Sequence, residues 1–282
     1  MKIIELPREA YQSMPAYIPP DVRASYLNAL LKVGFDTVEI GSITSARILP
    51  QMQGTLEILD LLKPETDSNI MVLVLNKKGA DFITQHEKVS HISFPFAVSP
   101  QFLKKNTNST VEETLKTTAY IVNLCHQHNK TPIVYFSMAF GNPYGEEWNL
   151  DLALHWIAIM RQMGISIIPL SNVSIPLDQA LISQYYSTLI PAFPEIEFGL
   201  HLHTTDAGAQ ARIHAAYSQG CRRFDGVING LGGCPMASDE MLGNLNTREL
   251  IRYFREHDIP YGLNQTLLEE AYRLASSHFI HS

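Results

Sequence analysis

Eight short β-rich runs alternate with longer amphipathic stretches from one end of this chain to the other. The runs expected to be strands are Ile3–Leu6, Thr37–Ile40, Ile70–Leu75, Ile92–Ala97, Ile133–Ser137, Ser166–Leu170, Phe198–His203 and Phe224–Ile228. Strands separated by helical segments form βα units, which build a parallel sheet. Eight such units favour a closed TIM (β/α)8 barrel over an open, doubly wound sheet. We therefore predict an α/β fold in which residues 1–282 form a single TIM-barrel domain.

The segments between these runs carry helix signals. Asp21–Leu31 and Trp148–Met163 have apolar residues at three-to-four spacing, which is typical of amphipathic helices. Ser109 is the expected N-cap of a further helix that runs to about Cys125. Residues 246–281 are long enough for the eighth barrel helix and one additional C-terminal helix.

Composition excludes several classes of function. The formal net charge of -7 argues against a nucleic-acid-binding protein, which usually has a basic face. No apolar run approaches the roughly 20 residues of a membrane-spanning helix, and Met1–Arg8 has no secretory apolar region. Three cysteines are an odd and sparse set, which favours a reducing compartment over a disulfide framework. We expect a cytoplasmic protein that binds neither nucleic acid nor membrane.

Polar side chains suited to chemistry gather at the ends of the expected strands, where TIM barrels build their sites. Arg8 and Glu9 follow the first strand, Glu39 ends the second, Asn172 follows the sixth, and His201 and His203 end the seventh. This convergence predicts an enzyme rather than a scaffold.

His201 and His203 are two residues apart in an expected strand, so their side chains share a face and can hold one metal ion. The alternative is a pair of ordinary buried histidines with hydrogen-bond partners. Glu9 is the best candidate for a carboxylate ligand, although it could be a surface carboxylate. Imidazole, carboxylate and carboxamide ligands suit a divalent ion such as Mn²⁺, Zn²⁺ or Mg²⁺.

Cys234 lies in the glycine-rich run 230–235. Glycines allow backbone angles that other residues cannot hold, so such a loop can close over a ligand and carry a thiol to it. The thiol could act as a nucleophile or a proton donor. The alternative is a tight turn in which the cysteine only packs. Arg8 could neutralise an oxyanion or form an ordinary salt bridge.

Several motifs together make the chain resemble the 3-hydroxy-3-methylglutaryl-CoA (HMG-CoA) lyase family over nearly its full length. They are Leu6-Pro7-Arg8-Glu9-Ala10-Tyr11-Gln12, Val38-Glu39-Ile40-Gly41-Ser42, Pro50-Gln51-Met52, Lys104-Lys105-Asn106, Phe140-Gly141-Asn142-Pro143-Tyr144-Gly145, and Gly230-Leu231-Gly232-Gly233-Cys234-Pro235 with Gly243-Asn244-Leu245. The glycine-rich loop followed by Gly-Asn-Leu is the most specific of them. The resemblance implies a metal-dependent TIM-barrel lyase.

The resemblance also implies roles for individual residues. His201, His203 and Asn244 are expected to bind the metal, with Glu9 in the place of a metal-binding aspartate. The expected catalytic residues are Arg8, which stabilises an enolate oxygen, Cys234, which transfers a proton, Glu39 and His201. Arg8, Gln12, Ser42 and Asn172 are expected to contact the substrate. Mg²⁺ or Mn²⁺ is the implied cofactor, an acyl-CoA the implied substrate, and a homodimer the implied assembly.

The implied reaction is the retro-Claisen cleavage of HMG-CoA to acetyl-CoA and acetoacetate, a step of leucine degradation. The chain departs from the family at four positions. Glu9 replaces an aspartate, Asn172 and Val173 replace the aspartate and the threonine of a Ser-x-Asp-Thr run, and Thr204 replaces an aspartate after the histidine pair. Two alternatives therefore stand beside HMG-CoA lyase. One is a divergent paralogue acting on another 3-hydroxy acid or acyl-CoA, and the other is a catalytically weakened barrel that binds a ligand.

Overall fold

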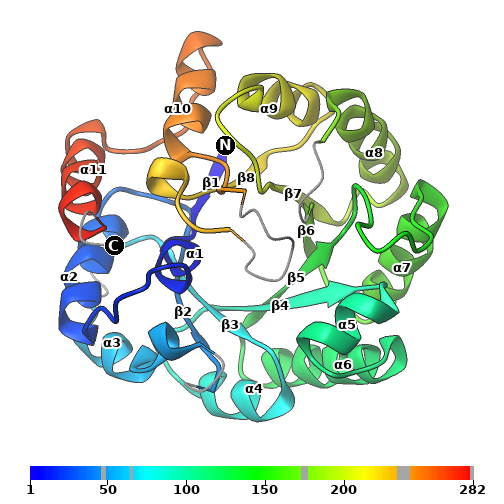
Figure 1. Ribbon diagram of the computed structural model, residues 1–282, viewed down its shortest axis with the longest axis horizontal. Coiled ribbons are helices and arrows are strands. Elements are labelled where there is room, and N and C mark those ends of the chain that lie inside the picture. Colours follow the sequence, from blue (N-terminus) through cyan, green and yellow to red (C-terminus); the bar gives the residue numbers. More distant parts are fainter. Residues whose placement is uncertain (46–48, 64–65, 173–176, 234–241, 280–282) are drawn as a thin grey trace.

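The eight predicted strands exist and close into a parallel barrel in chain order, which confirms the TIM-barrel prediction (Figure 1). The computed structural model describes residues 1–45, 49–63, 66–172, 177–233 and 242–279. The strands are β1 (Lys2–Glu5), β2 (Thr37–Ile43), β3 (Asn69–Val74), β4 (His91–Ala97), β5 (Thr131–Ser137), β6 (Ile167–Ser171), β7 (Glu197–His201) and β8 (Arg223–Gly226). Every neighbouring pair is parallel, including β1 with β8, which closes the barrel.

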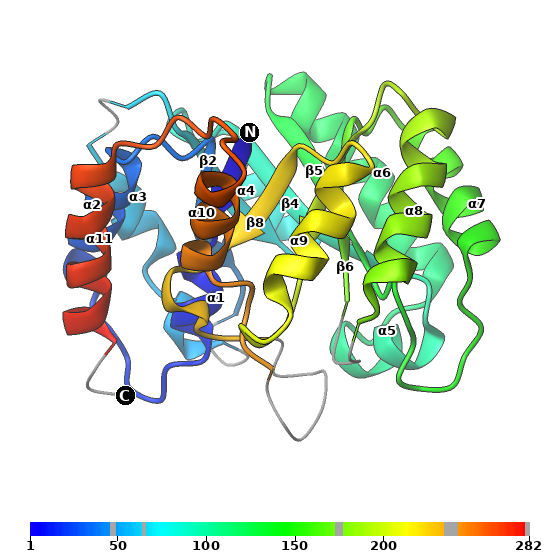
Figure 2. The same ribbon diagram turned by 90° about the horizontal axis from the view of Figure 1, so that it is seen from above.

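Most of the helices surround the strands and cover the outside of the barrel, whereas the short α1 lies inside this ring (Figure 1). The helices are α1 (Pro7–Gln12), α2 (Pro20–Leu31), α3 (Thr55–Leu61), α4 (Lys77–Ile83), α5 (Pro100–Asn106), α6 (Val111–Gln127), α7 (Leu150–Gln162), α8 (Gln179–Ala192), α9 (Ala209–Ser218), α10 (Thr247–Glu256) and α11 (Gln265–His278), with short 3₁₀ turns η1 (Pro50–Met52) and η2 (Ile228–Gly230). The additional C-terminal helix, α11, packs beside α2 (Figure 2). No helix in the described ranges is long and apolar enough to cross a membrane.

Predicted element ends differ from the observed ones by up to three residues. The N-cap of α6 is Thr110, not Ser109, because Thr110 and Glu113 bond each other reciprocally in a capping box. The Ser109 hydroxyl instead contacts those of neighbouring threonines. Strand β7 ends at His201, where its pairing with β6 stops at Ser171.

The strands are buried on both faces because side chains fill the inside of the barrel and helices cover the outside. Every residue of β6 is buried, as are six of the seven residues of β2. Parallel strands in this setting are continuous apolar runs rather than alternating ones. Charged side chains inside such a core need partners, and this requirement shapes the site at the barrel mouth.

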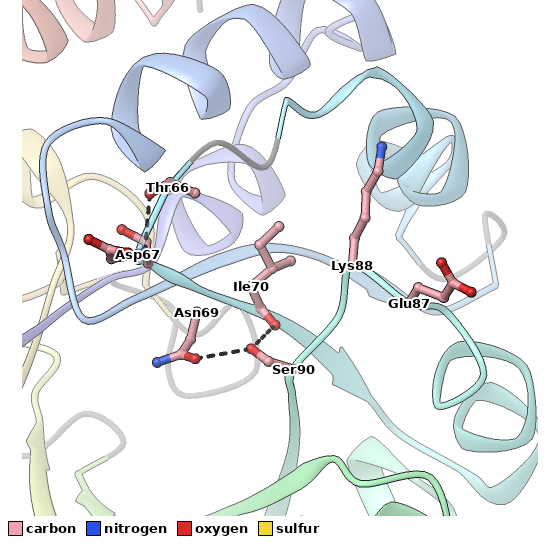
Figure 3. Close-up of a pocket in the computed structure, with 8 residues that line it drawn as sticks. Thr66, Asp67, Asn69, Ile70, Glu87, Lys88 and Ser90 are labelled. Atoms are coloured by element: carbon pink, nitrogen blue, oxygen red, sulfur yellow. Dashed lines mark hydrogen bonds between the residues drawn. The ribbon is translucent and has the colours of Figure 1, made fainter.

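An open pocket lies at the opposite, amino-terminal end of the barrel, beside the starts of β3 and β4 (Figure 3). Its polar groups are used in local connections. The Ser90 hydroxyl donates to Asn69 Oδ1 and to the Ile70 carbonyl, and Lys88 Nζ donates to the Leu59 and Leu62 carbonyls at the end of α3. This end of a TIM barrel serves stability rather than chemistry.

Candidate active site at the barrel mouth

Helix α1 begins directly after β1 and brings Arg8 and Glu9 to the carboxyl end of the barrel. Pro7 occupies the first turn of this short helix, where its missing N–H costs nothing. Arg8 is only 7% exposed and Glu9 only 6% exposed. Arginine and glutamate are rarely this buried unless they are paired.

Arg8 is the centre of a buried ion-pair network. Its Nε donates to Glu39 Oε2 at 2.7 Å, its Nη2 to Glu9 Oε1 at 2.6 Å and its Nη1 to Gln12 Oε1 at 2.9 Å. Burial acts to lower the pKa of Arg8, but the charges of Glu39 and Glu9 outweigh it and hold that pKa above its ordinary value. A guanidinium has five N–H donors, so these three bonds to described residues leave two donors for a ligand.

Glu39 lies inside β2 rather than at its end, which corrects the sequence prediction. The register of β2 against β3 shifts directly after it, between Glu39 and Gly41, and such irregularities re-aim side chains near active sites. The Ser93 hydroxyl of β4 donates to Glu39 Oε1 at 2.8 Å. Burial raises the pKa of the Glu39 carboxyl; the charge of Arg8 only partly offsets this, and that of Glu9 adds to it.

His201 is held by a carboxylate that the sequence analysis did not identify. Its Nδ1 lies 3.2 Å from Asp225 Oδ2 on the neighbouring strand β8, and its ring meets that of Tyr135 edge to face with centroids 5.2 Å apart. Burial acts to lower the pKa of His201, but the contact with Asp225 outweighs it and raises that pKa. The signal in the sequence was an acidic residue within the otherwise apolar run Phe224–Ile228 that was expected to be a strand.

His203 and Asn244 are brought together by main-chain pairing beyond the end of β7. They form an antiparallel bridge, flanked by bonds from Thr204 N to Gly243 O and from Leu245 N to Leu202 O. In this type of pair the two side chains lie close together on one face. The two histidine rings are neighbours, with centroids 5.2 Å apart. His201 and His203 are thus adjacent as predicted, although they do not belong to one continuous strand.

Three of the buried polar atoms that have no hydrogen-bond partner among the described residues lie in this group. They are both ring nitrogens of His203 and Oδ1 of Asn244, whose Nδ2 is anchored on the Leu231 carbonyl at 2.7 Å. Burial, with a smaller effect of His201, lowers the pKa of His203 to about 4, so its ring is neutral at neutral pH. A buried polar atom without a partner is costly, and neutral imidazole and amide oxygen are both metal-ligand groups. This donor set therefore fits a divalent cation.

Glu9 stands beside these groups. Burial alone would raise its pKa, but Arg8, His201 and His203 lower it, so the carboxylate is ionised. In the described part of the chain, no three His, Cys, Asp or Glu side chains form a preformed metal cluster. The candidate set combines two imidazoles with a carboxamide and places the carboxylate of Glu9 against Arg8.

The other expected substrate contacts are engaged within the protein. The Asn172 carboxamide bonds the main chain of His203, and the Ser42 hydroxyl lies 2.8 Å from Thr44 Oγ1. Gln12 accepts from Arg8 and donates through Nε2 to the Gly233 carbonyl at 3.5 Å. Their substrate contacts remain predictions.

The described part of the glycine-rich run, residues 230–233, passes directly over α1. At Gly232, which has φ +87°, a Cβ atom would lie 2.2 Å from the Glu9 carbonyl oxygen. At Gly233 it would lie 2.1 Å from the Leu242 carbonyl oxygen. Glycine is therefore required at both positions. Cys234 itself lies outside the described residues.

The remaining cysteines, Cys125 and Cys221, are buried and free, as expected of structural cysteines. Burial raises the pKa of both thiols to about 12. A thiol with so high a pKa is not a nucleophile at neutral pH.

Comparison with known proteins agrees with this geometry. The model of the HMGL-like family matches residues 4–274. The chain belongs to the HMGL-like family. Hydroxymethylglutaryl-CoA lyase YngG of Bacillus subtilis (strain 168) is 25% identical over 253 residues, which are 90% of this chain and 84% of that protein. (R)-citramalyl-CoA lyase of Chloroflexus aurantiacus is 26% identical over 277 residues, with 93% of this chain and 85% of that protein covered.

A solved structure of an HMG-CoA lyase from Acinetobacter baumannii, in complex with coenzyme A and 3-methylmalate, superposes with a TM-score of 0.91 at 24% identity. The match covers 100% of this chain and 92% of that one, and it confirms the barrel fold. Family membership and the named relatives identify the chain as a carbon–carbon lyase of the acyl-CoA lyase group. Mouse relatives are named both mitochondrial and cytoplasmic, so the cytoplasmic location stays a prediction.

Proposed function

We propose that the chain is a metal-dependent lyase that cleaves HMG-CoA to acetyl-CoA and acetoacetate, with residues 1–282 acting as one catalytic domain. One observation carries the proposal. Buried polar atoms of His203 and Asn244 that have no partner among the described residues gather beside His201 and Glu9, at the barrel end where TIM-barrel enzymes place their sites. An uncompensated polar group of this kind is expected where a ligand completes the structure.

His201, His203, Asn244 and Glu9 are the residues that would hold Mg²⁺ or Mn²⁺. The cation would polarise the tertiary hydroxyl of the substrate and so acidify it. Asp225 on Nδ1 of His201 orients that ring and increases the basicity of its other nitrogen, as carboxylates do behind metal-binding histidines. Two imidazoles and a carboxamide with one carboxylate favour Mn²⁺ more than an all-oxygen set would.

The reaction needs one proton removed, one carbon–carbon bond broken and one proton added. A base of the site takes the hydroxyl proton. Glu39 is the candidate, because His201 would have one ring nitrogen on Asp225 and the other on the cation. Burial raises the pKa of Glu39 above its ordinary value, which makes this carboxylate a stronger base. The bond between the carbinol carbon and the thioester α-carbon then breaks, the hydroxyl carbon becomes the ketone of acetoacetate, and the electron pair passes to the thioester as an enolate.

Arg8 is suited to stabilise the enolate oxygen. Its position is determined by Glu39, Gln12 and Glu9, and two N–H donors remain for the oxyanion. Cys234 would then protonate the enolate carbon to give acetyl-CoA. Gly232 and Gly233, which precede Cys234 in the chain, contact Glu9 and Gln12 of α1.

The test is a coupled assay of acetoacetate release from HMG-CoA by the purified protein, with Mg²⁺, with Mn²⁺ and with a chelator. We expect turnover that depends on the cation. Metal binding without turnover on HMG-CoA would reject this substrate. Absence of both binding and turnover would reject the metal-dependent function itself.

A related acyl-CoA is a second candidate substrate. The (R)-citramalyl-CoA lyase of Chloroflexus aurantiacus is as similar to this chain as the HMG-CoA lyases are. In addition, Asn172, which was expected to contact the substrate, bonds the main chain of His203 instead. Citramalyl-CoA carries the same tertiary hydroxyl next to a shorter acid, and its cleavage releases pyruvate. Running the assay on both thioesters, with acetoacetate and pyruvate detected separately, distinguishes the two.

A further inference from the structure

Asn172 makes a two-point contact with the main chain of His203. His203 N donates to Asn172 Oδ1 at 2.8 Å, and Asn172 Nδ2 donates to the His203 carbonyl at 2.9 Å. The side chain is 3% exposed, so water does not compete for these bonds. The contact defines the orientation of the amide, because only the oxygen can accept from the N–H and only the nitrogen can donate to the carbonyl.

This contact lies where the β-ladder has ended. The β6–β7 pairing stops at Ser171 and His201. The Asn172 side chain then supplies the hydrogen bonds that a further strand residue would supply. On its other side, the segment around His203 is bound through Thr204 and Leu202 to the segment around Asn244. His203 is therefore held from both edges although it belongs to no regular strand.

We propose that Asn172 is a positioning residue, which locks the main chain of His203 and thereby aims its imidazole at the cation. This inference rests on the metal-dependent function proposed above. The lock needs one donor and one acceptor on the same short side chain, and asparagine supplies both. Aspartate, which the HMG-CoA lyase pattern has here, cannot donate when ionised and would put a carboxylate oxygen against the His203 carbonyl.

Two effects of Asn172→Asp have opposite signs, which makes the test decisive. An added negative charge close to the site would by itself strengthen the binding of a divalent cation. Loss of the lock would weaken it, and removal of a group that orients a metal ligand typically costs about 10- to 100-fold in affinity. The lock therefore predicts that Asn172→Asp weakens Mn²⁺ binding in spite of the added charge.

The experiment is a calorimetric Mn²⁺ titration of wild type, Asn172→Asp and Asn172→Leu, with the thermal midpoint recorded for each. Amide hydrogen exchange of His203 is followed in the same proteins without metal. We expect about 10- to 100-fold weaker Mn²⁺ binding in both variants and faster exchange of the His203 amide in Asn172→Leu. Asn172→Ser, which is too short to reach either atom, replaces the leucine variant if that one does not fold.

Asn246→Asp is the matched control. Asn246 is the buried N-cap of α10 and accepts from Arg248 N, a role that aspartate fills equally well. Asn246→Asp adds the same charge close to Asn244, and the Mn²⁺ affinity of this variant should be unchanged or higher. If wild type binds Mn²⁺ and Asn172→Asp binds it equally tightly or more tightly, Asn172 is not a positioning residue for His203. Wild-type protein that binds no Mn²⁺ overturns the proposed function, and the role of Asn172 with it.

Discussion

His203 and Asn244 face one another across an antiparallel bridge, and each has a buried polar atom without a partner among the described residues. The main chain brings them together through the bonds from Thr204 to Gly243 and from Leu245 to Leu202. Two proposed ligands from different βα connections are therefore held in place before any cation arrives. Such preorganisation removes part of the entropic cost of binding.

Asp225 is expected to control metal affinity through His201. Asp225→Asn removes the negative charge beside Nδ1 of His201. Loss of a carboxylate that bonds a metal-binding histidine typically costs about 10- to 100-fold in metal affinity. An Mn²⁺ titration of the variant measures this loss of affinity. Asp36→Asn is the control, because Asp36 approaches Arg223 at the other end of the barrel. Equal losses in the two variants would mean a general electrostatic effect.

Glu9→Ala should weaken metal binding by at least about 10-fold, because it removes the carboxylate expected to complete the ligand set. Arg8 keeps Glu39 and Gln12 as partners, so the barrel mouth should stay folded. Calorimetry on the variant and on Glu112→Ala, which breaks only an exposed pair on α6, gives the comparison. Unchanged affinity would remove Glu9 from the site.

Cys234→Ser should abolish most turnover, by about 10²- to 10⁴-fold as for loss of a general acid, and leave the thermal midpoint unchanged. The reason is that a hydroxyl is a far weaker acid than a thiol. The steady-state rate on HMG-CoA is the measurement. Cys125→Ser serves as the control, since that thiol is buried in α6. A Cys234→Ser enzyme as fast as wild type would show that the loop thiol is incidental.

Gly232→Ala should reduce both stability and turnover. The new Cβ would collide with the Glu9 carbonyl oxygen, and the left-handed backbone adds strain of about 1–3 kcal/mol. Gly262→Ala has a similar positive φ with nothing within 4 Å of the added atom, so it reports the backbone strain alone. Denaturant unfolding and the lyase assay on both variants separate the two effects. Loss of turnover in Gly262→Ala as well would contradict a local effect on the site.

Glu5 should make stability fall as pH rises. Burial raises the pKa of this carboxyl from 4.5 to about 8, although Thr247 Oγ1 and Ile228 N donate to it and partly oppose the shift. Between these two values the folded state holds a proton that the unfolded state releases, so stability is lost across this window.

Each pKa unit corresponds to about 1.4 kcal/mol, so Glu5→Gln should gain a few kcal/mol relative to wild type over the same range. Urea unfolding of both proteins from about pH 5 to about pH 9 measures the difference, in which all other titrating groups cancel. A difference that stays constant with pH would show that Glu5 is already ionised in the folded protein.

Local patterns in the sequence were sufficient for the elements. The alternation of apolar runs and amphipathic stretches located all eight strands and the extra helix α11. Ends were less accurate, because a helix start depends on which of two adjacent hydroxyls, Ser109 or Thr110, wins the capping bond. The histidine pair was identified because His201 and His203 were expected to lie in one strand. This reason is only partly right, since β7 ends at His201.

The barrel, the end of the barrel at which polar groups collect, and the residue types available there could all be predicted from the sequence, because they follow from periodicity and from the order of strands. The partners of these side chains could not be predicted and came from the folded structure. Asp225 behind His201, Asn172 on the main chain of His203, and Asn244 opposite it are contacts between separate βα units. Such contacts are made by the closure of the sheet, which no local pattern of side chains encodes.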